Sequence, residues 1–468
     1  MSMRFSRGLN RMTAVALVAT AVVVSVHAQT PTIADGYGAV ARRIATASLL
    51  GNGALDRLHH LCRVIGPRLA GSPAQAKAEA WALEELRRAG CDIVRREPCK
   101  VPVWVRGHAR VEITSPESEA LPVLALGGSV GTPKGGIEAE VVAVRSFVEL
   151  ERLGRDHVRG KIVVYDVPWE GYGKTVSYRV DGAARAAALG AVGVLVRSSG
   201  FGGSRTPHTG TLKYAEGIPE IPAAALSFED AGRIGKTVRD GKPMRIRMDL
   251  GCRTMPDADG ANIVGDYLGS EQPDEIVLLG AHLDSWDVGE GAQDDGGGVA
   301  SVVEVPAVLK RLGLRPRRTI RIVLFANEEN GLRGARAYEA AHRSTAKRHV
   351  AAIENDGGVE TPTGFGMKLP AGATTDDPRF RTFTDIVALL GPLGAAKATT
   401  NGGGADIAPL APHGVPMMSI NTVGTRYFEW HHTVLDTFEA VDPKALDAHV
   451  GIHAVLAYVL ADMRETLR

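Results

Sequence analysis

The chain has 468 residues, and its 54 Lys and Arg nearly balance its 53 Asp and Glu, giving a formal net charge of +1 at pH 7. This length allows two or three domains with sizeable cores, and the balanced charge gives no electrostatic reason to expect nucleic acid or an anionic membrane as partner. The 55 glycines and 5% aromatic content favour an α/β protein with many tight turns.

The N-terminus has the three parts of an export signal. A basic segment at 4–11 precedes an apolar run at 12–26, and Ala28 closes a small-x-small cleavage site. The apolar run is short for a membrane span. We therefore expect residues 1–28 to be a cleaved signal peptide, and the mature protein to be periplasmic or secreted without stable membrane insertion.

The next segment, up to residue 114, is predicted to begin with helices around 39–50 and 55–65. A further helix is expected from Pro73 to Leu86, with Pro just inside its start and Gly90 past its end. Strands are predicted at 91–96, 101–105 and 109–114.

Residues 115–251 have a different pattern, which predicts a β-rich insert. A Gly-, Ser- and Thr-rich stretch at 198–217 indicates a long exposed loop. The segment contains no concentration of catalytic groups, so we expect it to carry no chemistry. Its predicted strands are 123–126, 138–144, 161–166, 192–196 and 223–226, with one helix at 181–189.

From Ala261 onward, short apolar strands alternate with helices. This alternation predicts an α/β fold with a mostly parallel mixed sheet flanked by helices on both faces. In such sheets ligands bind beyond the carboxyl ends of the strands. The predicted strands are 275–280, 320–326, 350–353 and 415–420, and the helices are 298–312, 334–342, 380–390 and 443–460.

Polar residues follow three of these strands. His282 and Glu328 each come two residues after a strand, and Asp356 comes three residues after another. Because the carboxyl ends of parallel strands share one edge, these side chains should meet there. Buried carboxylates and imidazoles are costly unless they are paired or bind metal.

These residues fit a site for two divalent ions, in which one carboxylate bridges the metals. We expect His282 and Asp356 to bind one ion, Glu329 and His432 to bind the other, and Asp294 to bridge both. The mixed nitrogen and oxygen ligands suit Zn²⁺, with Co²⁺ or Mn²⁺ as substitutes.

Two acidic residues remain beside the predicted ligands. Glu328 is placed to act as a general base toward the attacking water. Asp284, two residues after His282, is expected to hold that imidazole in one tautomer.

Each segment also has an ordinary structural explanation. His282 could be a capping or core histidine, Asp294 a helix N-cap, and Glu328 and Glu329 a solvated helix start. Asp356 before two glycines could form a plain turn. All of these explanations would have to hold together to remove the metal site.

The motifs together resemble the M28 family of zinc peptidases, across nearly the whole mature chain. They are the segments His282-Leu-Asp-Ser-Trp-Asp-Val-Gly-Glu-Gly-Ala-Gln-Asp-Asp-Gly-Gly-Gly298, Asn327-Glu-Glu329, Glu354-Asn-Asp356, Gly404-Ala-Asp-Ile407 and His432-Thr-Val-Leu-Asp-Thr437.

The resemblance implies a zinc-peptidase, phosphorylase/hydrolase-like fold with the same ligands. It favours His432 over His431, because the family pattern places Asp-Thr four residues after the ligand, and it implies a cis peptide after Asp294. It also implies a discontinuous peptidase domain at 29–114 and 252–468, an inserted protease-associated (PA) domain at 115–251, and a homodimer.

The implied activity is a di-zinc exopeptidase acting on dipeptides or short peptides, with Gly404, Asp406 and Tyr427 lining the substrate pocket. The alternatives are an aminopeptidase acting on longer peptides, an inactive binding protein on a peptidase scaffold, and a glutaminyl cyclase-like acyltransferase. A two-metal phosphatase or nuclease is disfavoured, because the basic groups that a phosphate needs are missing.

The four cysteines are compatible with either disulfides or free thiols. Four cysteines allow three pairings, and an oxidising compartment permits disulfides, but a chain this large does not need them. Cys62, Cys91, Cys99 and Cys252 are the residues concerned.

Overall fold

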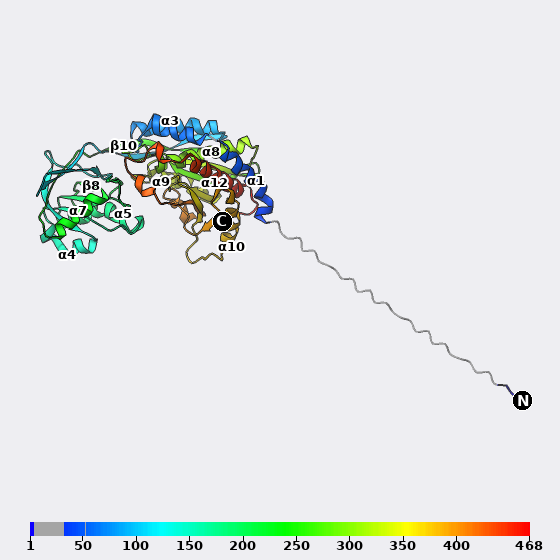
Figure 1. Ribbon diagram of the computed structural model, residues 1–468. Helices are drawn as coiled ribbons and strands as arrows, with labels where there is room; N and C mark the ends of the chain where they lie inside the picture. The colour runs from blue at the N-terminus through cyan, green and yellow to red at the C-terminus, as the bar shows by residue number, and fades with distance from the viewer. Residues whose placement is uncertain (4–31, 52) are drawn as a thin grey trace.

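The computed structural model describes residues 1–3, 32–51 and 53–468, and the expected signal peptide at 1–28 lies almost entirely outside the described residues. Figure 1 shows two bodies side by side. The larger body carries α3, α8 and α12, and the smaller carries α4, α5 and α7.

The larger body is built on an eight-stranded sheet, and its central strands β12, β11, β13 and β16 are parallel, as the sequence predicts. The flanking pairs β1–β10, β10–β12 and β14–β16 are antiparallel. In spatial order the strands are β1 (Ile93–Val105), β10 (Arg253–Tyr267), β12 (Arg318–Phe325), β11 (Gln272–His282), β13 (His349–Glu354), β16 (Met417–Thr422), β14 (Pro362–Met367) and β15 (Lys397–Thr399).

Helices cover both faces of this sheet, which agrees with the predicted fold class. Val277 and Leu279 of β11 face the larger core cluster, while Ile276 and Leu278 face a second cluster against α9 (Arg333–His342). This two-sided burial explains the continuous apolar strands. On the first face lie α1 (Ile33–Leu49), α2 (Ala54–His59), α3 (Pro73–Ala89), α8 (Gly297–Arg311), α10 (Pro378–Ala388) and α12 (Pro443–Asp462).

Short helical turns complete the larger body. They are η1 (His60–Ile65), η2 (Ala292–Gly296), η3 (Arg343–Arg348), η4 (Gly391–Leu393), η5 (Ala408–His413), α11 (Tyr427–Trp430) and η6 (Phe438–Ala440).

Helix α12 is long and apolar enough to cross a membrane, and it is the one such helix among the described residues. However, 83% of its apolar window is buried inside the protein. It packs against α1, α8 and β11, so it is the central helix of the core.

The smaller body, which we call the inserted unit, contains the second eight-stranded sheet. Helix α7 covers one face, and α4 and α6 cover the other. Its strands in spatial order are β3 (Glu119–Leu121), β2 (Ala109–Ser115), β9 (Arg245–Leu250), β5 (Ile137–Val144), β6 (Ile162–Tyr165), β7 (Gly193–Arg197), β8 (Ala223–Leu226) and β4 (Val123–Ala125), and its helices are α4 (Phe147–Val158), α5 (Tyr172–Val180), α6 (Gly182–Ala188) and α7 (Phe228–Arg239).

The inserted unit differs from the sequence prediction in several respects, the first being that strands β3 and β9 were not predicted. Strand β2 pairs with β9 in the second sheet, so this sheet begins before residue 115. Helices α4, α5 and α7 were not predicted. The loop at 198–217 is not exposed throughout, because residues 207–210 are buried. The loop turns inward at this point and reaches the larger body.

The four cysteines are free thiols in this structure. Burial raises the pKa of Cys62 and of Cys91 to about 12 and that of Cys99 and of Cys252 to about 11. They therefore remain protonated at neutral pH.

Two buried histidines in α12 make the fold sensitive to acid. His449 donates to the Glu360 carbonyl (2.9 Å) and His453 donates to the His449 carbonyl (2.7 Å), while their other ring nitrogens have no partner among the described residues. Burial lowers the pKa of His449 to about 4 and the pKa of His453 to about 3. The folded state therefore holds both rings neutral.

We predict that the free energy of unfolding falls as the pH drops below about 6.5. Below that pH the histidines become protonated in the unfolded state but stay neutral in the folded state. Each contributes about 1.4 kcal/mol per pH unit until its folded pKa is reached. His453→Gln should make this pH dependence shallower in urea unfolding between pH 7 and 4.5. His157→Gln, at an exposed position in α4, is the control. Equal slopes for wild type and His453→Gln would contradict the prediction.

Candidate metal centre

The predicted site residues meet at the carboxyl edge of the larger sheet. His282 is the last residue of β11 rather than the second after it, Glu328 is the third residue after β12, and Asp356 is the second after β13. These offsets differ from the predicted ones by one or two residues because the strands end at different points. The expected convergence at one edge is nevertheless observed.

His282 is fully buried, and its neighbours fix its tautomer. Its Nδ1 lies 3.0 Å from the Asp284 carbonyl oxygen, which can only accept, so Nδ1 carries the proton. Nε2 is therefore the ring nitrogen left to bind a metal, and it faces Asp294 Oδ1 at 3.0 Å and Asp356 Oδ1 at 3.4 Å. Its backbone N–H donates to Asp295 Oδ2 (3.1 Å).

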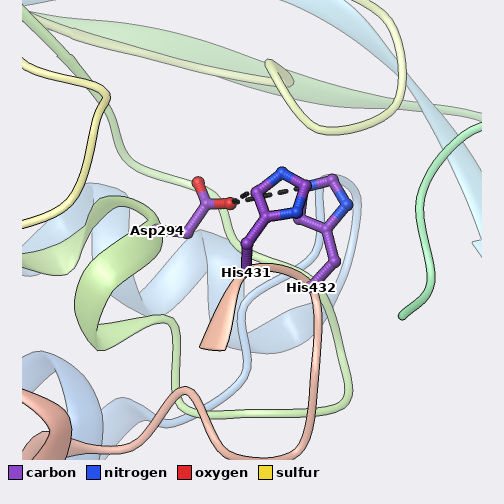
Figure 2. Close-up of side chains that lie close together, drawn as sticks. All are labelled: Asp294, His431 and His432. Atoms are coloured by element: carbon purple, nitrogen blue, oxygen red, sulfur yellow. Dashed lines mark ion pairs between the residues drawn. The ribbon is translucent and has the colours of Figure 1, made fainter. Parts of the chain in front are cut away.

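Asp294 lies between two groups of side chains. One oxygen faces His282, and the other, Oδ2, lies 3.3 Å from His432 Nε2 and 4.0 Å from His431 Nε2. Figure 2 shows this carboxylate pointing at the two imidazoles, which stack with their ring centroids 3.6 Å apart. The Asp294–Asp295 peptide is cis, as the family resemblance implies.

His432 also meets Glu329, its predicted partner. Nε2 of His432 lies 3.1 Å from Glu329 Oε2, whereas His431 approaches Asp294 alone, and only at 4.0 Å. Nδ1 of His432 lies 3.2 Å from the carbonyl of Thr209 and 3.4 Å from Arg179 Nη1, both in the inserted unit, so this ring also turns its Nε2 toward the carboxylates.

The spacing of these atoms fits bound metal ions. Four ligands about 2.0 Å from a tetrahedral zinc lie about 3.3 Å from one another. The nitrogen–oxygen distances of 3.0 to 3.4 Å around Asp294 match this value. His282, Asp294 and Asp356 form one group able to hold an ion, and Asp294 with His431 and His432 forms another.

Glu328 is adjacent to Glu329, but unlike the predicted carboxylate ligands it forms no ion pair with His282 or His432 among the described residues. Burial, followed by the charge of Asp356, raises the pKa of Glu328 well above its usual value. Burial and the adjacent Asp294 raise the pKa of Glu329 to about 7. Carboxylates crowded in this way need protons or cations to balance them.

Asp284 contacts His282 differently from the expectation. Its backbone carbonyl, rather than its carboxylate, is the nearer partner of the imidazole, since the carboxylate Oδ1 lies 3.8 Å away. The carboxylate instead accepts from the backbone N–H groups of Glu328 (3.0 Å) and Glu329 (3.3 Å). Asp284 therefore orients the turn that carries both glutamates.

The three residues predicted to line the substrate pocket lie in different surroundings. Gly404 packs on Glu354 so closely that a Cβ would collide with its carboxyl group. Asp406 is 1% exposed, and both of its oxygens lack a partner among the described residues. Tyr427 is half-buried, and its ring centroid lies 5.2 Å from that of His431.

Two charged residues that hold the Asp294 loop were not predicted. Asp436 accepts from the backbone N–H groups of Ala292, Gln293 and Asp294 (2.6 to 3.2 Å). In the sequence, Asp436 followed by Thr437 had indicated only the family motif. Arg68, in the loop before α3, has no sequence signal of this role, because its partners are backbone carbonyls.

Arg68 is fully buried and joins the segments that carry His282 and Asp294. Its guanidinium donates to the carbonyls of Leu283 (2.7 Å), Glu290 (2.8 Å) and Gly291 (2.9 Å). A buried carbonyl that loses its donor is costly.

We predict that Arg68→Met lowers the free energy of unfolding by roughly 3 kcal/mol, because it leaves these carbonyls unpaired while keeping most of the side-chain volume. Urea unfolding of the metal-free protein measures the change without a contribution from metal binding. Arg88→Met, with an exposed side chain on α3, is the control and should stay within about 0.5 kcal/mol of wild type. An equally small effect of Arg68→Met would show that this contact is dispensable.

Comparisons with known proteins agree with the family resemblance. The model of peptidase family M28 matches residues 262–457. The chain is 40% identical over 434 residues to carboxypeptidase Q of Mus musculus, covering 92% of this chain and 91% of that protein. It is 38% identical to carboxypeptidase Q of Homo sapiens, covering 92% and 90%.

Solved structures extend the likeness to the whole fold. The peptidase M28 precursor from Shewanella amazonensis has a TM-score of 0.88 at 37% identity, covering 93% of this chain and 98% of its own. BSAP, a zinc aminopeptidase from Bacillus subtilis, has a TM-score of 0.65 at 21% identity, covering 88% and 96%. The second likeness concerns the fold alone.

Proposed function

Because the chain belongs to peptidase family M28 and is a metallo-exopeptidase, we propose that it hydrolyses dipeptides or short peptides at a centre holding two zinc ions. The observation that carries this proposal is the spacing of the ligand atoms. Four nitrogen–oxygen pairs are 3.0 to 3.4 Å apart, and they join the Nε2 atoms of His282 and His432 to the carboxylates of Asp294, Asp356 and Glu329.

In this proposal Asp294 would be shared by the two ions, His282 and Asp356 would hold one of them, and Glu329 and His432 would hold the other. Zinc held by these residues would supply a Lewis acid for the scissile carbonyl and would lower the pKa of the attacking water. The carbonyls of Asp284 and Thr209 keep both imidazoles in the tautomer that presents Nε2.

Glu328 is the proposed general base. It takes a proton from the attacking water and delivers it to the leaving amine. Asp284 positions Glu328 by accepting its backbone N–H. Burial and the neighbouring acidic groups raise the pKa of Glu328. A raised pKa helps this carboxylate to take up the proton of the water, as a general base must.

Substrate binding is assigned to the edge of the same site. Tyr427 lies beside His431 and is proposed to line the pocket. Asp406, whose carboxylate has no partner within the described part of the chain, is proposed to balance the positive charge of a free substrate terminus. Gly404 is proposed to line the pocket through its backbone while leaving space for Glu354.

The remaining expectations are part of the same proposal. We assign residues 1–28 to a signal peptide with export of the mature chain, the inserted unit to a protease-associated domain, and the assembly to a homodimer. The complete set of candidate ligands argues against an inactive binding scaffold. The identity to carboxypeptidase Q over nine-tenths of the chain favours peptide hydrolysis over glutamine cyclisation.

A dipeptide library assayed with and without a chelator tests the activity. Hydrolysis should require metal and recover when zinc is added back. Versions of the best substrate with a blocked N- or C-terminus then separate aminopeptidase from carboxypeptidase or dipeptidase action. Turnover of an N-terminal Gln peptide to a cyclic product, without hydrolysis of any library member, would instead establish the cyclase alternative.

We predict that Glu328→Gln lowers kcat by roughly 100-fold or more, because the amide cannot accept the proton. The fold and the zinc content, measured by circular dichroism and elemental analysis, should be unchanged. Glu465→Gln, at an exposed position near the C-terminus, is the matched control. Near wild-type turnover by Glu328→Gln would remove Glu328 as the base.

A further inference from the structure

The inserted unit meets His432 of the candidate metal centre through Thr209 and Arg179, whose Nη1 lies 3.4 Å from His432 Nδ1, and Thr209 makes the closer contacts. Thr209 is fully buried and forms two contacts with His432. The Thr209 N–H donates to the His432 carbonyl (2.9 Å), and the Thr209 carbonyl accepts from His432 Nδ1 (3.2 Å). One contact fixes the backbone of His432, and the other fixes the rotation of its ring.

The backbone of His432 needs outside support. Its φ is +61°, in the left-handed region that residues other than glycine seldom adopt. This conformation costs roughly 1 to 2 kcal/mol and persists where neighbouring groups hold it. The two contacts with Thr209 supply such support from the inserted unit, outside the larger body.

Thr209 is in turn held on its far side. Its Oγ1 donates to the Ala125 carbonyl at the end of β4 (2.9 Å) and accepts from Arg106 Nη1 (3.1 Å). Arg106 also binds Asp287 through Nε, 3.1 and 3.0 Å from the two carboxylate oxygens. The hydroxyl of Thr209 thus links the sheet of the inserted unit to the segment between His282 and Asp294.

Glu329 rests on the inserted unit as well, through Trp286. The backbone N–H of Trp286 donates to Glu329 Oε1 (3.1 Å). The indole ring is 3% exposed and belongs to a core cluster of the inserted unit. It packs so closely on Gly127 that a Cβ at Gly127 would collide with it.

His282 has a different support. Its ring is held by the Asp284 carbonyl and its backbone by Asp295, both of which belong to the larger body. The two candidate ligand sets are therefore positioned by different parts of the chain.

We propose that the inserted unit positions His432 and Glu329, with Thr209 as the key positioning residue, and so sets the affinity of this one ligand pair for metal. The affinity of the His282–Asp356 pair is set by the larger body alone. This inference rests on the proposed two-metal site and deepens it. It gives the insert, which the sequence indicated to be without chemistry, a part in the metal centre.

Zinc titration of the metal-free full-length protein, in competition with a chromophoric chelator, tests the proposal. Wild type should bind two ions per chain. The step that belongs to His432 and Glu329 is identified as the one lost in His432→Ala and retained in His282→Ala. Thr209→Val removes the anchoring hydroxyl at nearly constant shape and should weaken this step by roughly 10- to 100-fold, with the other step unchanged.

Thr209→Ser keeps a hydroxyl and should restore most of the affinity. Thr211→Val, two residues along the same loop and without a contact to His432 among the described hydrogen bonds, is the matched control and should behave as wild type. If Thr209→Val does not fold, Arg106→Gln removes the same anchor from the other side and should weaken the same step.

Equal affinities of wild type and a folded Thr209→Val or Arg106→Gln at both steps would overturn the inference and leave the proposed function standing. Equal weakening of both steps would also overturn it, since it would indicate a general loss of structure. Fewer than two ions bound by wild type would remove the two-metal function itself, and this inference with it.

Discussion

The structure depends on a concentration of buried negative charge at the carboxyl edge of one sheet. Asp284, Asp294, Glu329, Glu354 and Asp406 each expose 5% or less of their surface. Some accept backbone N–H groups, as Asp284 does from Glu328 and as Glu354 does from Ile407 (2.8 Å). The carboxylates around Asp294 instead face imidazole nitrogens and one another, an arrangement that becomes favourable when cations occupy the space between them.

This convergence could be predicted because it follows from strand direction. Parallel strands end at one edge, so His282, Glu328 and Asp356 had to meet even though their offsets from the strand ends were wrong by one or two residues. The short strands β14 and β15 and helices α4, α5 and α7 were missed, because brief or weakly apolar segments carry little periodic signal. The substrate-lining assignments of Gly404, Asp406 and Tyr427 remain predictions.

The supports of the site could not be predicted, because they use backbone atoms of distant segments. Arg68 binds carbonyls more than 200 residues away along the chain, and any residue could have supplied those carbonyls. Likewise, Thr209 lies 223 residues from His432, in a loop whose composition predicted exposure. A residue that acts through its main chain leaves no pattern of side-chain types.

Asp294 and His432 are therefore held in place by different parts of the protein. Asp436 and Arg68 both hold the Asp294 loop, Asp436 by accepting N–H groups and Arg68 by donating to carbonyls. Both belong to the larger body, so the distance from Asp294 to His282 is internal to that body. The distance from Asp294 to His432 depends also on Thr209, and hence on how the inserted unit sits. A small shift of the insert would alter the second ligand set first, because its contacts end at His432 and Glu329 and do not extend to His282.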